Sequence, residues 1–197
     1  VDCQDFCKNF AKKGYVTASV NYRLVSLINI ASFLSNHDEQ YEEVLKATLD
    51  VKAAIRYFRK DFATGDTYGI DPNTIFVGGT SAGAITAIHL AYIDDISDLP
   101  ITPLDIQAVA NSLGGLEGDA GNLGYSSEVN GVISFAGGIN TLSWIDTNDE
   151  PIVSIQGDAD ETVFYNCGPG LGQPSVLTLC GAGEIHPQAD LVGVIND

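Results

Sequence analysis

The sequence predicts an α/β fold in which a predominantly parallel sheet carries helices on both faces. Two observations point to it: short apolar runs without polar alternation, such as residues 132–135 and 151–155, and strand-like runs that alternate with helical periodicity. Strands that are apolar throughout are buried on both sides, as in parallel sheets covered by helices. A chain of 197 residues without internal repeat or linker is expected to form a single domain over residues 1–197.

The first half of the chain contains one predicted strand and one long predicted helix. Residues 15–20 follow a short basic helix and Gly14, and their β-rich composition predicts a buried strand. From residue 41 to about residue 63, apolar side chains recur every three or four positions, which predicts an amphipathic helix. The residues of its apolar face are Val44, Ala47, Val51, Ile55, Phe58 and Phe62, with Lys52 and Arg59 among the charged residues elsewhere around the helix.

The second half predicts three further strands and a buried helix. After a turn at residues 69–73, residues 74–78 form a second apolar strand. Residues 81–92 then form a short and nearly uncharged helix, which indicates burial on most of its sides. Residues 111–130 are rich in glycine and loop-like, and residues 132–135 and 151–155 are the third and fourth strands.

The charge of the chain bears on its partners. Nine Lys and Arg against 26 Asp and Glu give a formal net charge of −17. Such a surface repels phosphate backbones and anionic membranes, so we expect no nucleic-acid partner and easier access for neutral or cationic substrates. No apolar run is long enough to span a bilayer.

Four cysteines and the absence of methionine bear on processing and compartment. Cys3 and Cys7 share one face of the expected first helix, while Cys167 and Cys180 bracket a Gly/Pro-rich loop. Their spacing fits no zinc site. We expect disulfides, with the pairing open, and an exported protein; the alternative is four free thiols in a cytosolic protein. Without any methionine, the chain is interpreted as a processed product or a fragment. No cofactor or metal is expected, since the acidic turn around Asp160 lacks a full calcium loop.

The motif Gly-Thr-Ser-Ala-Gly at residues 79–83 is the strongest chemical signal. It directly follows a buried strand and opens a helix, where a nucleophile elbow lifts a serine hydroxyl above the sheet. Ser81 is therefore the predicted nucleophile, and the backbone N–H of Ala82 a predicted oxyanion-hole donor. The alternative is an ordinary glycine-rich turn with a serine that caps the helix.

A serine nucleophile needs a histidine base and an acid that orients it. The acid is expected just after a later strand, and Asp160 follows the fourth strand, with Asp158 as the second choice. Among the three histidines, His37 precedes Ser81 and His89 lies two turns into the helix after it. His186 alone follows Asp160, so it is the candidate base within this chain.

The chain resembles the secreted bacterial carboxylesterase branch of the α/β-hydrolase superfamily. The resemblance rests on residues 14–24, with Asn-Tyr-Arg-Leu at 21–24, on residues 50–57, on the approach and elbow at 68–83, and on residues 151–160. Family members carry a His-Gly-Gly oxyanion loop before the segment where this chain begins. They place the catalytic histidine after one more strand, and in that alignment it falls beyond Asp197.

The resemblance implies a serine carboxylic ester hydrolase that forms an acyl-enzyme with a small-molecule ester. The glycine-rich segment 114–127 and Trp144 are candidates to line its pocket, or else a surface loop and a core indole. The alternative function is a non-catalytic α/β-hydrolase-fold module for binding or structure. The sequence does not define the oligomeric state.

Overall fold

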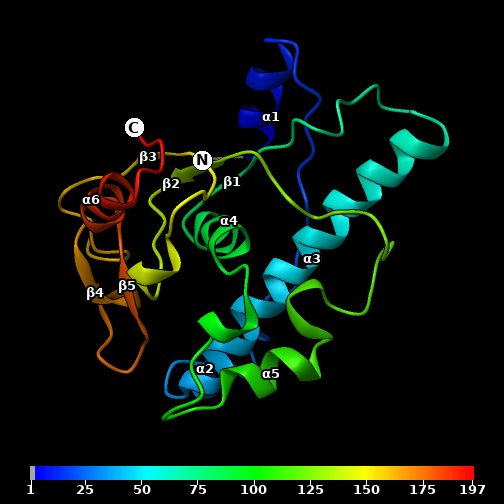
Figure 1. Ribbon diagram of the computed structural model, residues 1–197. Coiled ribbons are helices and arrows are strands. Elements are labelled where there is room, and N and C mark those ends of the chain that lie inside the picture. Colours follow the sequence, from blue (N-terminus) through cyan, green and yellow to red (C-terminus); the bar gives the residue numbers. More distant parts are fainter. Residues whose placement is uncertain (1–2) are drawn as a thin grey trace.

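Three short parallel strands form the centre of the computed structural model, which describes residues 3–197 (Figure 1). They are β1 (Val77–Thr80), β2 (Val132–Phe135) and β3 (Ile152–Ile155), in the order β1-β2-β3. Thr80 pairs with Phe135 and Phe135 with Ile155, so all three strands end at one edge of the sheet. The predicted parallel α/β architecture is confirmed, with each of these strands within a few residues of its expected position.

Helices lie on both faces of this sheet. α4 (Ala82–Tyr92) packs against β1 and β2 on one side and against the long helix α3 (His37–Thr64) on the other. On the opposite face, the Phe6 ring of α1 (Cys3–Ala11) lies 4.4 Å from the Phe135 ring of β2. The remaining elements are α2 (Ile30–Phe33), η1 (Ile96–Asp98), α5 (Ile106–Ser112), η2 (Gly115–Glu117), η3 (Leu142–Trp144), β4 (Cys167–Pro169), η4 (Gly170–Gly172), β5 (Thr178–Cys180) and α6 (Ala182–Val192).

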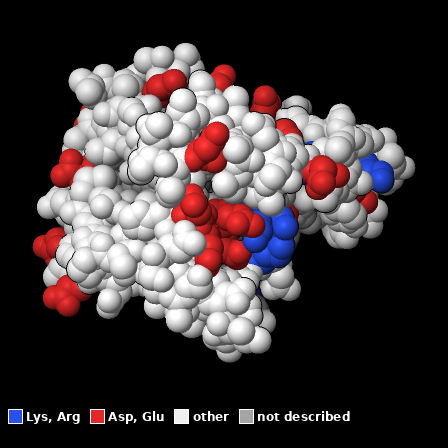
Figure 2. Space-filling view, turned by 90° about the horizontal axis from the view of Figure 1, so that it is seen from below, with Lys and Arg blue, Asp and Glu red and all other residues white. Residues whose placement is uncertain are grey.

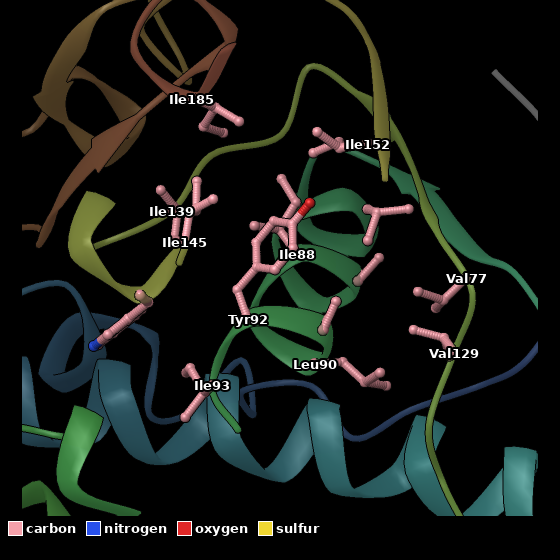
Figure 3. Packing of buried hydrophobic residues seen from close by; sticks show 14 of the residues in the cluster. Val77, Ile88, Leu90, Tyr92, Ile93, Val129, Ile139, Ile145, Ile152 and Ile185 are labelled. Carbon is pink, nitrogen blue, oxygen red and sulfur yellow. The ribbon is translucent and has the colours of Figure 1, made fainter. Parts of the chain in front are cut away.

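The hydrophobic core surrounds α4 (Figure 3). Ile88 and Tyr92 are fully buried, and their neighbours Val132 and Ile152 come from the sheet and Ile185 from α6. The nearly uncharged composition of α4 is thus explained, because from Thr86 to Tyr92 every residue is buried. A helix enclosed on most sides cannot carry charged side chains without partners.

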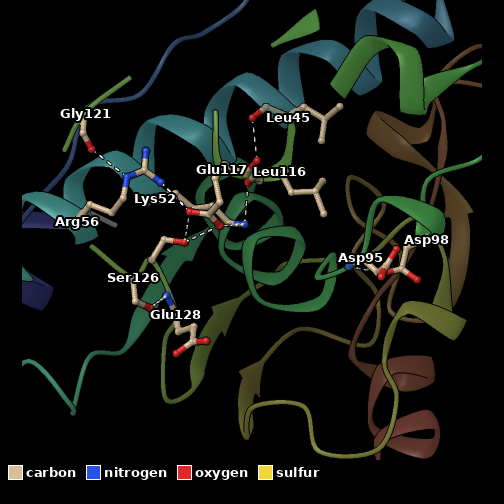
Figure 4. Close-up of polar contacts among 12 residues, drawn as sticks. Leu45, Lys52, Arg56, Asp95, Asp98, Leu116, Glu117, Gly121, Ser126 and Glu128 are labelled. Carbon is tan, nitrogen blue, oxygen red and sulfur yellow. Dashed lines mark hydrogen bonds and ion pairs between the residues drawn. The ribbon is translucent and has the colours of Figure 1, made fainter. Parts of the chain in front are cut away.

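The buried face of α3 differs from the predicted one. Phe62 is 43% exposed, whereas Lys52 and Arg56 are buried at 8% and 1% exposure. Both cations are enclosed because Glu117 supplies a carboxylate: Lys52 Nζ lies 3.0 Å from Glu117 Oε1 and Arg56 Nη1 2.8 Å from Glu117 Oε2 (Figure 4). A buried charge is tolerated when it is paired and hydrogen-bonded.

The predicted strand at residues 15–20 is wrong. No strand is assigned there, and Tyr15 and Val16 are each 50% exposed. The segment contacts helix α1 instead: the Thr17 hydroxyl donates to the Cys7 carbonyl of α1 at 3.1 Å. β-branched and aromatic residues fit a pleated, half-buried surface, but such a composition does not by itself provide a neighbouring strand to pair with.

A small antiparallel hairpin carries a disulfide. β4 and β5 place Cys167 opposite Cys180, and the two are bonded. This bond closes the predicted Gly/Pro-rich loop and confirms that the chain contains a disulfide. Cys3 and Cys7 carry free thiols.

The acidic composition is visible on the surface. On the face shown in Figure 2, Asp and Glu side chains cover more of the surface than Lys and Arg side chains, which lie next to some of them. Within residues 3–197, no helix is both long enough and apolar enough to cross a membrane.

Candidate active site

Ser81 lies in the tight turn between β1 and α4, in an unusual backbone conformation. Its φ is +52° and its ψ is −118°, a region that residues other than glycine rarely adopt. The turn also needs glycine at position 79, because a Cβ there would lie 2.6 Å from the Gly83 carbonyl oxygen. β1 and the first turn of α4 therefore approach more closely than any side chain would allow.

The main chain of Ser81 is hydrogen-bonded on both sides, although the residue as a whole is exposed. The Ser81 N–H donates to the Phe135 carbonyl at 2.8 Å, and its carbonyl accepts from the Ile85 N–H at 2.9 Å. Its side chain makes no capping hydrogen bond to α4, so the reading as an ordinary capping serine is not supported. Ala82 is the first residue of α4, where N–H groups have no acceptor within the helix.

Asp160 lies beyond β3, at the same edge of the sheet as Ser81. Its Oδ1 accepts from the Thr162 N–H at 2.8 Å and from the Val163 N–H at 3.0 Å. In the part of the chain that the structure describes, its second oxygen has no hydrogen-bond partner. Asp158 is exposed and its carboxylate makes no such bond. Asp160 is therefore the better oriented of the two candidate acids.

His186 lies at the opposite edge of the sheet. It is in α6, and its Nδ1 lies 2.6 Å from Asn196 Oδ1. Asn196 pairs with Ile152, the first residue of β3, whereas Ser81 follows the last residue of β1. The structure therefore does not bring His186 together with Ser81 and Asp160.

The two other histidines are also placed away from the Ser81 hydroxyl. His89 is 2% exposed, with Nδ1 2.7 Å from the Ile85 carbonyl oxygen and Nε2 2.8 Å from Asn140 Oδ1. Burial lowers the pKa of His89, which favours its neutral form. His37 is exposed at the first position of α3.

The two candidate pocket features have structural roles. Segment 114–127 is held along α3 by the bonds of Lys52 and Arg56 to Glu117 and to loop carbonyls (Figure 4). Burial acts to raise the pKa of Glu117, but the Ser127 hydroxyl and the two cations outweigh it and hold that pKa below its usual value. Trp144 is buried, and its indole N–H donates to the Asp98 carbonyl at 2.8 Å.

The described residues, 3–197, contain no candidate metal site. No group of three or more His, Cys, Asp or Glu side chains with suitable geometry occurs among them.

Comparisons with known proteins place the chain in a family. The model of the BD-FAE family matches residues 2–144. Solved structures with a similar fold include a truncated carbohydrate esterase from gut microbiota, with a TM-score of 0.55 and 21% identity over 77% of this chain and 57% of that one. Thermogutta terrifontis esterase 2 phosphoramylated by tabun gives a TM-score of 0.63 with 19% identity, over 98% of this chain and 62% of that one. The propionate-bound form of that esterase gives a TM-score of 0.60 with 20% identity, over 98% of this chain and 63% of that one.

This chain therefore spans about three-fifths of the length of the structures it resembles, from 57% to 63%. No curated protein matches it significantly. The predicted resemblance to the α/β-hydrolase superfamily is confirmed by the family match and the shared fold. The chain belongs to the BD-FAE family and has the α/β-hydrolase fold.

Proposed function

We propose that this chain carries the nucleophile and the orienting acid of a serine carboxylic ester hydrolase. The observation that carries the proposal is Ser81: an exposed residue on a strained turn between strand β1 and the largely buried helix α4. Strain of this kind persists where the surrounding structure enforces it, and it concentrates at functional sites. The BD-FAE family match and the esterases of similar fold support an esterase-type hydrolase.

The reaction proceeds through an acyl-enzyme. Ser81 Oγ attacks the ester carbonyl carbon while a histidine accepts its proton. The C–O bond of the ester then breaks, and the alcohol leaves with that proton. The Ala82 N–H donates to the oxyanion, and Asp160 orients the imidazole and stabilises its charged form. Water then attacks the acyl-enzyme in the same way and releases the acid.

The general base is the least defined member of the triad. His186 bonds to Asn196 at the far edge of the sheet, and His89 has both ring nitrogens engaged in the core. The base is therefore assigned to a histidine outside these 197 residues, with His186 as the alternative. A non-catalytic module of the same fold is the competing function.

The substrate is a small neutral or cationic ester, since the net charge of −17 disfavours polyanions. The Cys167–Cys180 disulfide supports an extracytoplasmic location.

Hydrolysis of short p-nitrophenyl esters by the full-length protein tests the function. Ser81→Ala should lower kcat by at least about 10³-fold, and Asp160→Asn by a similar order. His186→Gln should leave kcat near the parent value, and residues 1–197 alone should be nearly inactive. Equal turnover by Ser81→Ala would favour the non-catalytic module, whereas high activity of residues 1–197 that His186→Gln abolishes would make His186 the base.

A further inference from the structure

The side chain of Tyr22 lies on the first turn of α4, close to the Ser81 turn. A Cβ added at Gly83 would be 3.8 Å from the Tyr22 hydroxyl oxygen, an ordinary contact distance. Tyr22 is half-buried, and burial, partly offset by a hydrogen bond with Thr86, raises the pKa of its phenol. The phenol is therefore neutral at pH 7 and able to share a hydrogen bond with the Thr86 hydroxyl.

These contacts lead directly to the main chain beside the nucleophile. The Thr86 hydroxyl donates to the Ala82 carbonyl at 2.8 Å. The next amide, that of Ile85, donates to the Ser81 carbonyl at 2.9 Å. Only the Thr86 side chain therefore lies between the Tyr22 hydroxyl and the main chain of Ala82. The N–H of Ala82 is the proposed oxyanion donor.

The Ser81 turn requires such external support. Its φ of +52° belongs to a sparsely populated region, which is retained only where the surroundings hold it. The Phe135 carbonyl holds the strand side of the turn through the Ser81 N–H. Tyr22 lies on the helix side, beside Gly83, two residues after the serine.

Tyr22 is itself held in place by the next residue. The main-chain N–H of Arg23 donates to Asp50 Oδ2 at 2.7 Å, and its guanidinium lies 2.8 Å from Asp50 Oδ1. Asp50 is in the middle of α3, which packs against α4. A forked guanidinium–carboxylate pair fixes direction as well as distance, so it defines where residue 22 meets α4.

We propose that Tyr22 is a positioning residue for the nucleophile turn, anchored by the Arg23–Asp50 pair. It braces the first turn of α4, so that the Ser81 hydroxyl and the Ala82 N–H keep their geometry for attack. Tyr22 acts through α4 and not on the reacting atoms. The effect of Tyr22 on kcat rests on the proposed function, whereas its effect on the stability of the first turn of α4 does not.

The test compares Tyr22→Phe, which removes only the hydroxyl, with Tyr15→Phe, a matched change at a half-exposed tyrosine outside the site. In the full-length protein, Tyr22→Phe should lower kcat for p-nitrophenyl acetate by about 5- to 10-fold with KM within about twofold. Amide hydrogen exchange at Ile85 should accelerate by about fivefold or more, because the first turn of α4 opens more readily. Arg23→Gln should reproduce both effects, and Tyr15→Phe neither.

Parent-like kcat and parent-like Ile85 exchange in Tyr22→Phe would overturn the proposal. The proposal would also be overturned if Tyr22→Phe lost activity only in proportion to the fraction of protein that is unfolded, while the Ile85 amide of the folded protein exchanged at the parent rate. If the parent hydrolyses no ester, the proposed function fails, and Ile85 exchange alone still decides whether Tyr22 braces the turn.

Discussion

Glu117→Gln tests the ion-pair network that fastens segment 114–127 to α3. The substitution keeps the shape of the side chain but removes the charge that faces Lys52 and Arg56, which are 8% and 1% exposed. Removing one partner of a fully buried pair costs about 3–5 kcal/mol.

The expected cost here is smaller, for two structural reasons. The Glu117 side chain is 51% exposed, so water screens part of its attraction to the cations. In addition, Arg56 keeps its bonds to the Gly121 and Ala120 carbonyls, and Lys52 keeps the Leu116 carbonyl. We therefore expect Glu117→Gln to lower the free energy of unfolding by about 2 kcal/mol at pH 7.

Urea unfolding followed by circular dichroism measures this change. Glu42→Gln is the matched control, since Lys46 keeps Glu43 at 2.9 Å when Glu42 is neutralised, and it should cost less than about 0.5 kcal/mol. The folded-state pKa of Glu117 lies below its usual 4.5, so its contribution is present above pH 4.5 and is lost as the pH falls through the folded-state pKa. Parent and variant should therefore converge in acid. A variant as stable as the parent at pH 7 would refute this account of the network.

Three further changes have defined outcomes. Burial, together with neighbouring carboxylates, raises the pKa of Asp149 to about 6. The contribution of Asp149 to stability is therefore fully present below its usual pKa of 3.8, and it is lost as the pH rises through about 6. Asp149→Asn should therefore raise the free energy of unfolding at pH 7 by about 1 kcal/mol, after discounting for its partial exposure, with little change at pH 4. Reduction of the Cys167–Cys180 bond, which joins residues 13 apart, should lower stability by about 2–3 kcal/mol in urea unfolding with and without reductant. Gly79→Ala should lower stability by about 2 kcal/mol or more, because its Cβ would meet the backbone of Gly83.

Two of these predictions have matched controls. Asp119→Asn changes an exposed carboxylate and should change the free energy of unfolding at pH 7 by less than about 0.5 kcal/mol. Gly65→Ala adds a Cβ with no atom nearer than 3.9 Å and should change stability by less than about 0.5 kcal/mol. If Asp119→Asn changed stability as much as Asp149→Asn, burial of Asp149 would not explain its effect. If Gly65→Ala cost as much as Gly79→Ala, the close approach of Gly79 to Gly83 would not explain that loss.

The turn at Ser81 between β1 and α4 was predictable from sequence because every signal for it is local. The apolar run at residues 74–78, the glycine at 79 and the uncharged helix after Ser81 are adjacent in the chain. The positions of β2 and β3 followed from equally local apolar runs. The position of Asp160 at the same edge of the sheet as Ser81 followed from its place after β3, since parallel strands end at one edge.

The features missed depend on contacts between distant residues. Lys52 is buried because Glu117, 65 residues away, supplies its counter-charge. Residues 15–20 have strand composition but contact helix α1 and pair with no strand, which no local pattern predicts. Which edge of the sheet receives His186 depends on where α6 packs and on its bond to Asn196, 10 residues further along the chain.

Covalent labelling of Ser81 tests the central claim most directly. The full-length protein is treated with a fluorophosphonate, and the modified residue is identified by peptide mass spectrometry. The account predicts one adduct, on Ser81, which forms in the folded protein and is absent from Ser81→Ala and from urea-unfolded protein. An adduct on another residue, or equal labelling of Ser81→Ala, would contradict the assignment of Ser81 as the nucleophile.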